Sequence, residues 1–509
     1  MKIAKKITIV GGGTSAWMTA ALLVNNIGKE CEITLIDKKD GNPVGVGEAT
    51  ILSFKTFMDD CGFDLLDYFK EIDCTFKGGI LFENWKGEGK DIWHPFGFPN
   101  LDSLRIFEGS RTTIHEIWTN YQREYTNKKT DCEIHYNLAV RDNKMDPDNL
   151  RIYALHIDAG LLVKYIQKKI KDRITFIQGE VSSKATTHDG YIESLSLTDG
   201  SCHKADLFVD CTGFNGLLKD QDRVDLTDRL FCDTAIAGHV PYNDRPNELK
   251  PYTACDAVEH GWIWKIPVDQ RYGTGLVFNR SITPVEDAVD FFVEYWDKRL
   301  VKNHLKVLDW TPFYIRNFWE KNVVNVGLSA GFIEPLESTG IGLIAAGAWE
   351  LLSRIKTRTY DDNDINLYNA KMTCFFENSV DFVNMHYSRS KNEGKFWQWV
   401  HKVYKPSETL KWHADDYAYA IKDIESEGKE MFSGANWFCW MNQLDYPVCS
   451  KDLDMPPHIS RDILEKFYEQ EEQKFKYLPT ADVCNDNFRN IQPPVTYEKV
   501  NPWNENPFH

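Results

Sequence analysis

Small residues near the start of the chain have a spacing that suits close contact with a pyrophosphate. Gly11, Gly13 and Ala16 fit the pattern G-x-G-x-x-A, and Thr14 and Ser15 lie between the last two. The first glycine of such a pattern permits a tight turn, the second lets the backbone approach a ligand, and the small third residue lets a helix pack on a strand. This chemistry requires a strand before the glycines and a helix after them.

The flanking segments predict those elements. Residues 5–10 (KKITIV) indicate a strand, residues 16–26 (AWMTAALLVNN) a helix, and residues 32–37 (EITLID) a second strand. The second strand ends at Asp37, the place where an acidic residue binds a ribose hydroxyl of a dinucleotide. The sequence therefore predicts a Rossmann-like, dinucleotide-binding domain.

Two further glycine-containing segments favour FAD over NAD. VGVGEAT (44–50) contains Glu48 and Ala49, and ADLFVDCTGF (205–214) is a hydrophobic strand that runs into a glycine turn. Together they look like the flavin-binding halves of the FAD monooxygenase class. We therefore expect an α/β (α+β) fold of that type. Alternating strands and helices of some other α/β protein remain the alternative.

A pair of tryptophans forms a second notable feature. In GWIWKIP (261–267) the pattern is that of a strand, so Trp262 and Trp264 should point to the same side. Ile266 and Pro267 close the segment. An aromatic surface of this kind is usually core, and the alternative is a rigid wall that faces a ligand.

Composition limits the classes of function. The chain has 509 residues and a formal net charge of −17, which argues against a general nucleic-acid or anionic membrane surface. No segment reaches the roughly 18 apolar residues of a membrane span, and the N-terminus lacks the apolar core of a signal peptide. The twelve cysteines form no C-x-x-C pair and the histidines no H-E-x-x-H motif. We therefore expect a cytoplasmic protein with reduced thiols and without a metal site.

Three stretches carry a narrower resemblance. FKGGILFENW (76–85), GWIWKIP and GLSAGFIEPLESTGIGLI (327–344) together resemble the flavin-dependent halogenases, whose best-known members act on tryptophan. The likeness covers about residues 1–350, with the landmarks in the family's order. It implies an FAD-binding halogenase core over residues 1–370, followed by an aromatic-rich, mainly helical substrate region over residues 371–509.

The resemblance also implies a reaction. Reduced FAD (FADH2), supplied by a separate flavin reductase, reacts with O2 to give a flavin C4a-hydroperoxide. A halide ion (chloride, bromide or iodide) attacks the distal oxygen and gives hypohalous acid, which passes through an internal channel to an electron-rich aromatic substrate of the indole, phenol or pyrrole type. Members of the family are frequently dimers, so a homodimer is an expectation here.

Residues matching the family's motifs acquire roles through this resemblance. Lys77 would hydrogen-bond hypohalous acid or become a haloamine, and burial would lower its pKa. Glu337 would stabilise the cationic ring intermediate or take its proton, while Glu334 would be structural. Ser338 would position a water molecule or the substrate.

Further roles follow from the same motifs. Thr339 and Gly340 would bind halide through backbone N–H groups at a helix start, although an ordinary Ser–Thr helix cap explains the same residues. His94 and Phe96 would sandwich the aromatic ring. The tryptophan wall, with Ile266 and Pro267, would keep the substrate from the flavin. The remaining residues expected to bind FAD are Val181, Leu328 and Ile341.

Two other functions remain open on the sequence. An FAD-dependent aromatic hydroxylase shares the fold but transfers oxygen instead of halogen, and a non-catalytic FAD-binding protein could keep the fold alone. Lys77 and Glu337, within intact motifs, argue against the second. The aromatic stretches after residue 370 match no tryptophan-binding pattern residue by residue, so the aromatic substrate stays unassigned.

Overall fold

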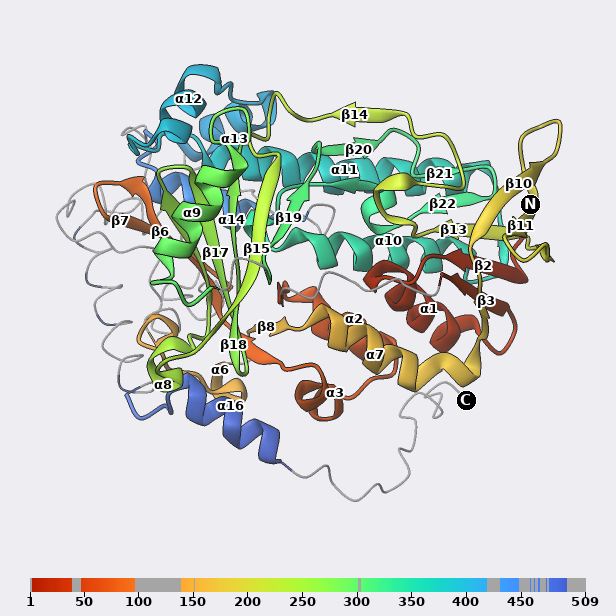
Figure 1. Ribbon diagram of the computed structural model, residues 1–509, viewed down its shortest axis with the longest axis horizontal. Coiled ribbons are helices and arrows are strands. Elements are labelled where there is room, and N and C mark those ends of the chain that lie inside the picture. Colours follow the sequence, from red (N-terminus) through yellow and green to blue (C-terminus); the bar gives the residue numbers. More distant parts are fainter. Residues whose placement is uncertain are drawn as a thin grey trace.

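The computed structural model describes residues 2–38, 47–96, 139–150, 152–300, 304–418, 431–447 and 476–491, with four single residues between 458 and 473. Figure 1 shows one sheet-and-helix unit on the right and a second, larger sheet on the left, with helices from the C-terminal part above and below them. The functional residues expected from the sequence all lie within the described part of the chain.

A six-stranded sheet forms the unit predicted from the glycine pattern. Its strand order is β21 (Trp319–Glu320), β22 (Val323–Asn325), β13 (Leu207–Asp210), β2 (Lys6–Val10), β3 (Glu32–Asp37) and β9 (Thr175–Gln178). All neighbours are parallel except the edge strand β21. Helix α1 (Thr14–Ile27) joins β2 to β3 and packs against α7 (Ala159–Ile170) and α10 (Thr339–Ile355). The Rossmann-like prediction is confirmed.

The second sheet has seven strands and contains the tryptophan pair. In order, these are β19 (Lys306–Asp309), β15 (Thr234–Pro241), β18 (Arg271–Phe278), β17 (Gly261–Val268), β16 (Thr253–Val258), β6 (Gly79–Gly87) and β7 (Lys90–Pro95). Only β16 and β6 pair in parallel. Trp262 and Trp264 lie on β17, opposite Ala257 and Cys255 of β16.

Smaller sheets accompany the two large ones. One has the order β4 (Glu48–Ala49), β8 (Ala154–Ile157) and β5 (Thr75–Lys77), and it places Lys77 at the end of a three-residue strand. The others are β10 (Val181–Thr186) with β11 (Ile192–Leu197) and β12 (Cys202–His203), β14 (Arg223–Asp225) with β20 (Phe313–Ile315) and β23 (Gly331–Phe332), and the pair β1 (Lys2–Ile3) and β24 (Thr359–Tyr360).

The described residues after position 361 are mainly helical, as expected from the sequence. Their helices are α11 (Asp362–His386), α12 (Lys395–Val403), α13 (Glu408–Ala418), α14 (Gly434–Gln443) and α16 (Ala481–Asn490). Elsewhere lie α2 (Ser53–Asp60), α3 (Leu65–Glu71), α6 (Pro147–Leu150), α8 (Arg245–Glu248) and α9 (Val285–Tyr295). The domain boundary proposed at residue 370 falls within α11, and buried apolar residues from both sides of it join one core. The division therefore stays a proposal.

Three general features bear on the sequence-based expectations. Within the described residues, no helix combines the length and the apolar character needed to cross a bilayer. The same residues contain no group of three or more His, Cys, Asp or Glu side chains that could hold a metal ion. Ten cysteines of this part are free thiols, and most of them are buried.

Candidate active site

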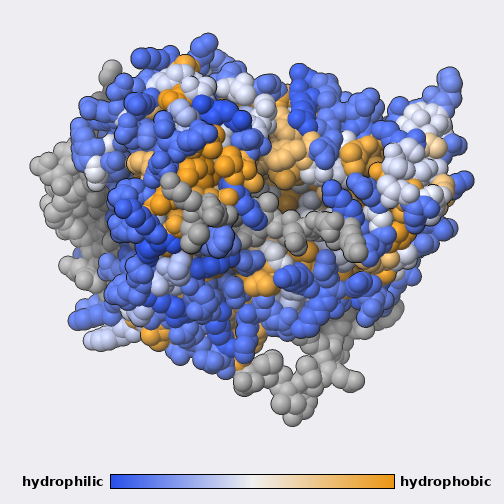
Figure 2. Space-filling view, in the orientation of Figure 1, coloured by the Kyte–Doolittle hydropathy of each residue, from blue (hydrophilic) through white to orange (hydrophobic). Residues whose placement is uncertain are grey.

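A cavity of about 1040 Å³ lies between the two large sheets. Figure 2 shows apolar residues gathered around a hollow near the middle of the same face. Most of the residues selected from the sequence line this cavity: Gly11, Gly13, Thr14, Ser15, Asp37, Glu48, Ala49, Val181, Trp264, Ile266, Leu328, Ser338, Thr339, Gly340 and Ile341. Residues far apart in the sequence thus share one space.

The glycine loop forms one end of the cavity. Gly11 has φ +132°, and a Cβ there would lie 2.2 Å from the Cys211 carbonyl oxygen, so only glycine fits. A Cβ on Gly13 would meet nothing within 4 Å, which leaves open space at the N-terminus of α1. Ala16 is fully buried and does not line the cavity, in agreement with a packing function. The loop therefore offers uncovered backbone to a ligand.

The space beside this loop fits FAD. No side chain caps the N-terminus of α1, where a helix dipole and free N–H groups attract phosphate. Burial raises the pKa of Asp37, at the end of β3, to about 6 and that of Glu48 to about 7. Both carboxyl groups face the cavity where hydroxyl groups of a dinucleotide could satisfy them.

Lys77 lies beyond the opposite end of the cavity. Its side chain is fully buried, and Nζ donates hydrogen bonds of 2.9 Å to Ser338 Oγ and of 2.9 Å to the Thr50 carbonyl oxygen. Burial lowers the pKa of Lys77 to about 7, although the nearby Glu337 and Cys255 act in the opposite direction. Because Ser338 itself lines the cavity, its hydroxyl connects Lys77 with that space.

The start of α10 resolves the question of a helix cap. Ser338 has a left-handed backbone (φ 60°), and its side chain makes no cap hydrogen bond to the helix. The fully buried Thr339 hydroxyl has no hydrogen-bond partner among the described residues, and a Cβ on Gly340 would meet nothing within 4 Å. An ordinary Ser–Thr cap is therefore not what these residues form. The first turn of α10 is open to a small anion.

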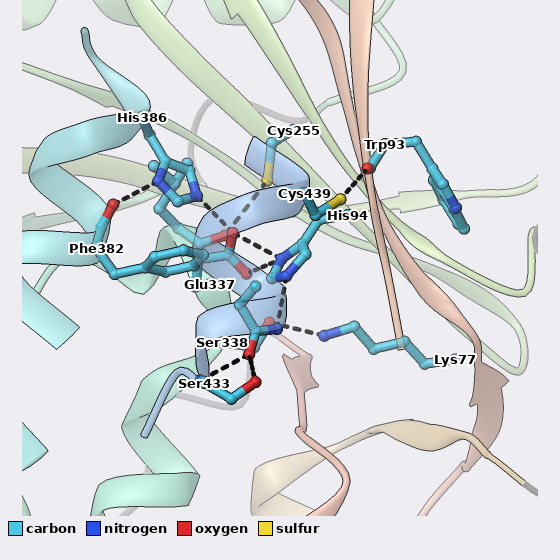
Figure 3. Close-up of polar contacts among 12 residues, drawn as sticks. Lys77, Trp93, His94, Cys255, Glu337, Ser338, Phe382, His386, Ser433 and Cys439 are labelled. Carbon is cyan, nitrogen blue, oxygen red and sulfur yellow. Dashed lines mark hydrogen bonds and ion pairs between the residues drawn. The ribbon is translucent and has the colours of Figure 1, made fainter. Parts of the chain in front are cut away.

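Glu337 is held between two histidines. His94 Nδ1, on β7, lies 2.9 Å and 3.0 Å from the two carboxylate oxygens, and His386 Nε2, at the end of α11, lies 2.5 Å from Oε1. All three side chains are at most 2% exposed. Figure 3 shows the carboxylate flanked by both rings, while Lys77 approaches Ser338 from the other side. We call Glu337, His94 and His386 the histidine–glutamate cluster.

Hydrogen bonds fix the protonation of His94. The Ser433 backbone N–H donates to Asn436 Oδ1, which leaves the Asn436 Nδ2 amide to donate to His94 Nε2 over 2.9 Å. Since Nε2 accepts, the ring proton must be on Nδ1, where it is donated to Glu337. His94 thus links Asn436 to Glu337 and orients the carboxylate.

His386 has a different relationship with Glu337. Its Nδ1 lies 2.7 Å from the Phe382 carbonyl oxygen, which can only accept, so Nδ1 carries a proton. A single further proton is then shared between His386 Nε2 and Glu337 Oε1. Burial acts to raise the pKa of Glu337, but His94 and His386 outweigh it and lower this pKa to about 2, whereas burial lowers the pKa of His386. Glu337 and His386 therefore form a coupled pair that holds one proton.

The two tryptophans of β17 have different surroundings. Trp264 and Ile266 line the cavity. Trp262 is fully buried, and its Nε1 donates to the Tyr387 hydroxyl, which in turn donates to Glu334. Burial raises the pKa of Glu334 to about 7. Core packing thus describes Trp262, and a wall facing the cavity describes Trp264.

The remaining residues assigned to the wall and to substrate binding are Pro267, Phe96 and His94. The Pro267 carbonyl oxygen accepts a hydrogen bond from the Thr75 hydroxyl, which ties β17 to β5. Phe96 is partly exposed, with Lys77 Nζ 4.9 Å from its ring centroid. His94 is almost inaccessible because Glu337 and Asn436 occupy both ring nitrogens. Ring stacking by His94 and Phe96 stays a prediction.

Sequence reasoning missed three residues of this region. His386 is a member of the histidine–glutamate cluster, and Asn436 hydrogen-bonds to His94 of that cluster. Tyr387 joins Trp262 to Glu334. None belongs to a motif with a recognisable spacing, because their partners lie between 49 and 342 positions away. The only signal was their place in the aromatic-rich C-terminal stretches.

Comparison with known proteins agrees with this site and this fold. The tryptophan halogenase family model matches residues 6–452, and the chain belongs to this family. It is an enzyme of the flavin-dependent halogenase type, and the family halogenates aromatic substrates.

Relatives and solved structures cover most of the chain. The chain is 28% identical to the tryptophan 7-halogenase RebH of Lentzea aerocolonigenes, over 85% of this chain and 88% of the relative. It is 27% identical to the tryptophan 6-halogenase ThaL of Streptomyces albogriseolus, over 86% and 88%. The structure of Xcc4156, a flavin-dependent halogenase from Xanthomonas campestris, superposes with a TM-score of 0.87 at 28% identity, covering 96% of this chain and 99% of the other.

Proposed function

We propose that the protein uses FADH2, O2 and a halide ion to halogenate an electron-rich aromatic ring through hypohalous acid. The observation that carries the proposal is the buried amine of Lys77, hydrogen-bonded to Ser338 where Ser338 lines the cavity. A lysine without access to water is expensive to bury, so a function beyond stability is expected.

The flavin would lie along the glycine loop. Gly11, Gly13 and the start of α1 would hold the pyrophosphate, Asp37 a ribose hydroxyl, and Glu48 the groups beside β4. The rest of the FAD molecule would be covered by Ala49, Val181, Leu328 and Ile341. Bound reduced FAD with O2 supplies the oxidising equivalent that turns a halide into hypohalous acid. A separate reductase would provide FADH2.

The halide and the substrate would occupy opposite sides of a wall. Halide would bind at the open first turn of α10, at Thr339 and Gly340. Trp264 and Ile266 would keep the aromatic substrate out of the flavin cavity. Hypohalous acid would then pass to Lys77, which holds it by a hydrogen bond or forms a haloamine with it.

The proton shared by Glu337 and His386 would complete the chemistry. As halogen is transferred to the ring, Glu337 donates this proton to the departing hydroxide, which leaves as water. The cationic ring then loses its own proton to Glu337, so that the pair regains its starting state. The sum is hypohalous acid plus arene giving halogenated arene plus water.

The relatives named above act on tryptophan, and we propose a wider class for this protein. Indoles, phenols and pyrroles all have rings that are electron-rich enough for electrophilic substitution. Stacking between Phe96, whose ring centroid lies 4.9 Å from Lys77 Nζ, and His94, which also orients Glu337, would suit a flat ring of any of these classes.

The decisive experiment combines a substrate panel with a lysine variant. Indoles, phenols and pyrroles are incubated with FAD, a generic reductase and each halide, and products are identified by mass spectrometry. Lys77→Ala should lower halogenation by about 10³-fold while reduced flavin is still oxidised by O2. The exposed Lys90→Ala variant is the matched control and should behave as wild type.

Two results would contradict the proposal. Retained halogenation in Lys77→Ala would remove the lysine from the mechanism. Products whose mass does not change when halide is withheld would identify an aromatic hydroxylase instead.

A further inference from the structure

The strand that ends at Lys77 has little support from its own sheet. β5 has three residues and pairs only with β8, where Thr75, Phe76 and Lys77 face His156, Leu155 and Ala154. On the opposite edge, the backbone of Cys74 and Phe76 would be left without partners inside the protein. A buried edge of this kind must be satisfied by other groups.

Helix α16, near the C-terminal end of the chain, satisfies that edge. Asn485 is fully buried, and its Oδ1 accepts a 3.2 Å hydrogen bond from the Phe76 backbone N–H. Its Nδ2 donates to the Ala481 carbonyl oxygen one turn earlier, over 2.6 Å, so the amide has one orientation only. One turn later, Arg489 donates to the Cys74 carbonyl oxygen.

Phe488 adds apolar contact between these two polar side chains. Its ring lies 5.2 Å from that of Phe76 and 4.7 Å from that of Phe69. The residue before Lys77 is thus held on both its backbone and its side chain by one helix.

The same helix also holds the strand of the tryptophan wall. Asp269 follows the last residue of β17, and it accepts from Arg489 at 2.9 Å and from Arg245 at 2.8 Å. Arg245 pairs in turn with Asp486 of α16 at 2.8 Å. The two ion pairs of Asp269 are partly shielded from solvent, so each of these two contributes more than an exposed pair would.

We propose that α16 is a positioning element for Lys77, and that Asn485 and Arg489 set the place of its amine relative to Ser338 and the wall. The inference rests on the proposed function of Lys77. It places a determinant of the reaction in residues 481–490, outside the 6–452 segment that matches the family model. Asn485 and Arg489 act through β5 and touch no substrate.

The experiment uses the full chain with bromide, indole and a generic flavin reductase. Asn485→Ala removes the acceptor for the Phe76 N–H, and Val483→Ala alters the exposed face of the same helix. Two quantities are measured: brominated indole formed per reduced flavin oxidised, and hydrogen exchange of peptides covering residues 74–78 in protein without flavin.

In Asn485→Ala we expect a loss of brominated product without a loss of flavin oxidation. Product per flavin oxidised should fall by about tenfold or more, because small displacements at a reacting centre have effects of this size, while flavin oxidation stays near wild type. Exchange in residues 74–78 should be about tenfold faster. Val483→Ala should match wild type in both measurements.

Several results would overturn the inference. One is an unchanged product ratio in Asn485→Ala, and another is equal loss in Val483→Ala. Loss of product and of flavin oxidation in proportion would reveal a general structural effect. Fast exchange of residues 74–78 in the wild type, compared with residues 154–157 of β8, would overturn it even if no variant folds. A wild type that makes no brominated indole contradicts the proposed function for indole, and the exchange measurement still tests the contact.

Discussion

The two ends of the cavity are built in different ways. At the nucleotide end, consecutive residues from Gly11 to Ser15 present backbone to open space. At the other end, Lys77 comes from β5, Glu337 from the turn before α10, His94 from β7 and His386 from α11, and each of them makes at least one contact between two side chains. A phosphate site needs only local backbone geometry, whereas proton transfer needs side chains that converge from distant segments.

The charges at the two ends also behave differently. Near the glycine loop, burial raises the pKa of Asp37 and of Glu48, and the weaker effect of Lys38 on Asp37 does not offset it. In the histidine–glutamate cluster, burial is outweighed by two imidazoles, so the pKa of Glu337 is lowered. Burial alone thus favours the protonated carboxyl group, whereas burial beside imidazoles favours the carboxylate and orients it.

Among the variants that test this comparison, the largest effect is expected from a substitution in the histidine–glutamate cluster that leaves the nucleotide end unchanged. His386→Asn should lower kcat for halogenation by about 100-fold, since the proton shared with Glu337 loses its second site. The KM for indole and the rate of flavin oxidation should change little, and the pH profile should change shape. Steady-state kinetics with flavin oxidation followed by absorbance would measure this.

The matched control for that variant is a histidine that does not line the cavity. His203→Asn removes a 2.7 Å contact between β12 and Thr8 of β2, and it should leave the halogenation rate and its pH profile intact. Equal loss of flavin oxidation and product in His386→Asn would mean that the cluster only stabilises the fold.

A smaller effect separates the two proposed actions of Lys77. Its pKa of about 7 means that the protonated fraction falls about tenfold between pH 6 and pH 8. Halogenation should therefore fall about tenfold over this interval if the ammonium holds hypohalous acid by a hydrogen bond. It should rise about tenfold if the neutral amine forms a haloamine. The rate of product formation at saturating reduced flavin distinguishes the two.

Other carboxyl groups titrate in the same range and need a control. Burial raises the pKa of Glu334 and that of Glu48 to about 7 as well. The change in halogenation rate between pH 6 and pH 8 should therefore persist in Glu334→Gln and in Glu48→Gln. A flat profile in the wild type would contradict the buried amine.

The smallest effect tests the nucleotide end alone. Gly13→Ala would place a methyl group in open space at the start of α1, so the protein should fold normally and bind FAD about fivefold more weakly. Gly11→Ala should instead destabilise the fold, because its Cβ would collide with Cys211. Flavin titration by fluorescence, with thermal unfolding of both variants, measures the difference. Equal stability of the two would contradict it.

The sequence predicted features that depend on neighbouring residues. The glycine loop, the strands on either side of α1 and the acidic end of β3 follow from local spacing, and the structure has all of them. Resemblance to the halogenases added Lys77 and Ser338, which lie in hydrogen-bond contact. The mechanistic roles of these residues are still proposals.

Features that depend on long-range contacts could not be predicted from the sequence. The spacing of Trp262 and Trp264 does not show that Trp264 lines the cavity while Trp262 bonds to Tyr387, which follows α11. The contacts of His94 with Asn436 and Glu337 also join distant segments, and its stacking on a substrate ring is still a prediction. Likewise, no pattern marks Asn485 as a partner of β5.

The sequence by itself determined the nucleotide-binding unit, because tight turns, helix starts and strand ends depend on adjacent residues. Only the tertiary structure decided which side chains hold Glu337 and Lys77. Their partners come from segments up to several hundred positions away, and hydrogen bonding between such segments is set by how helices and sheets pack.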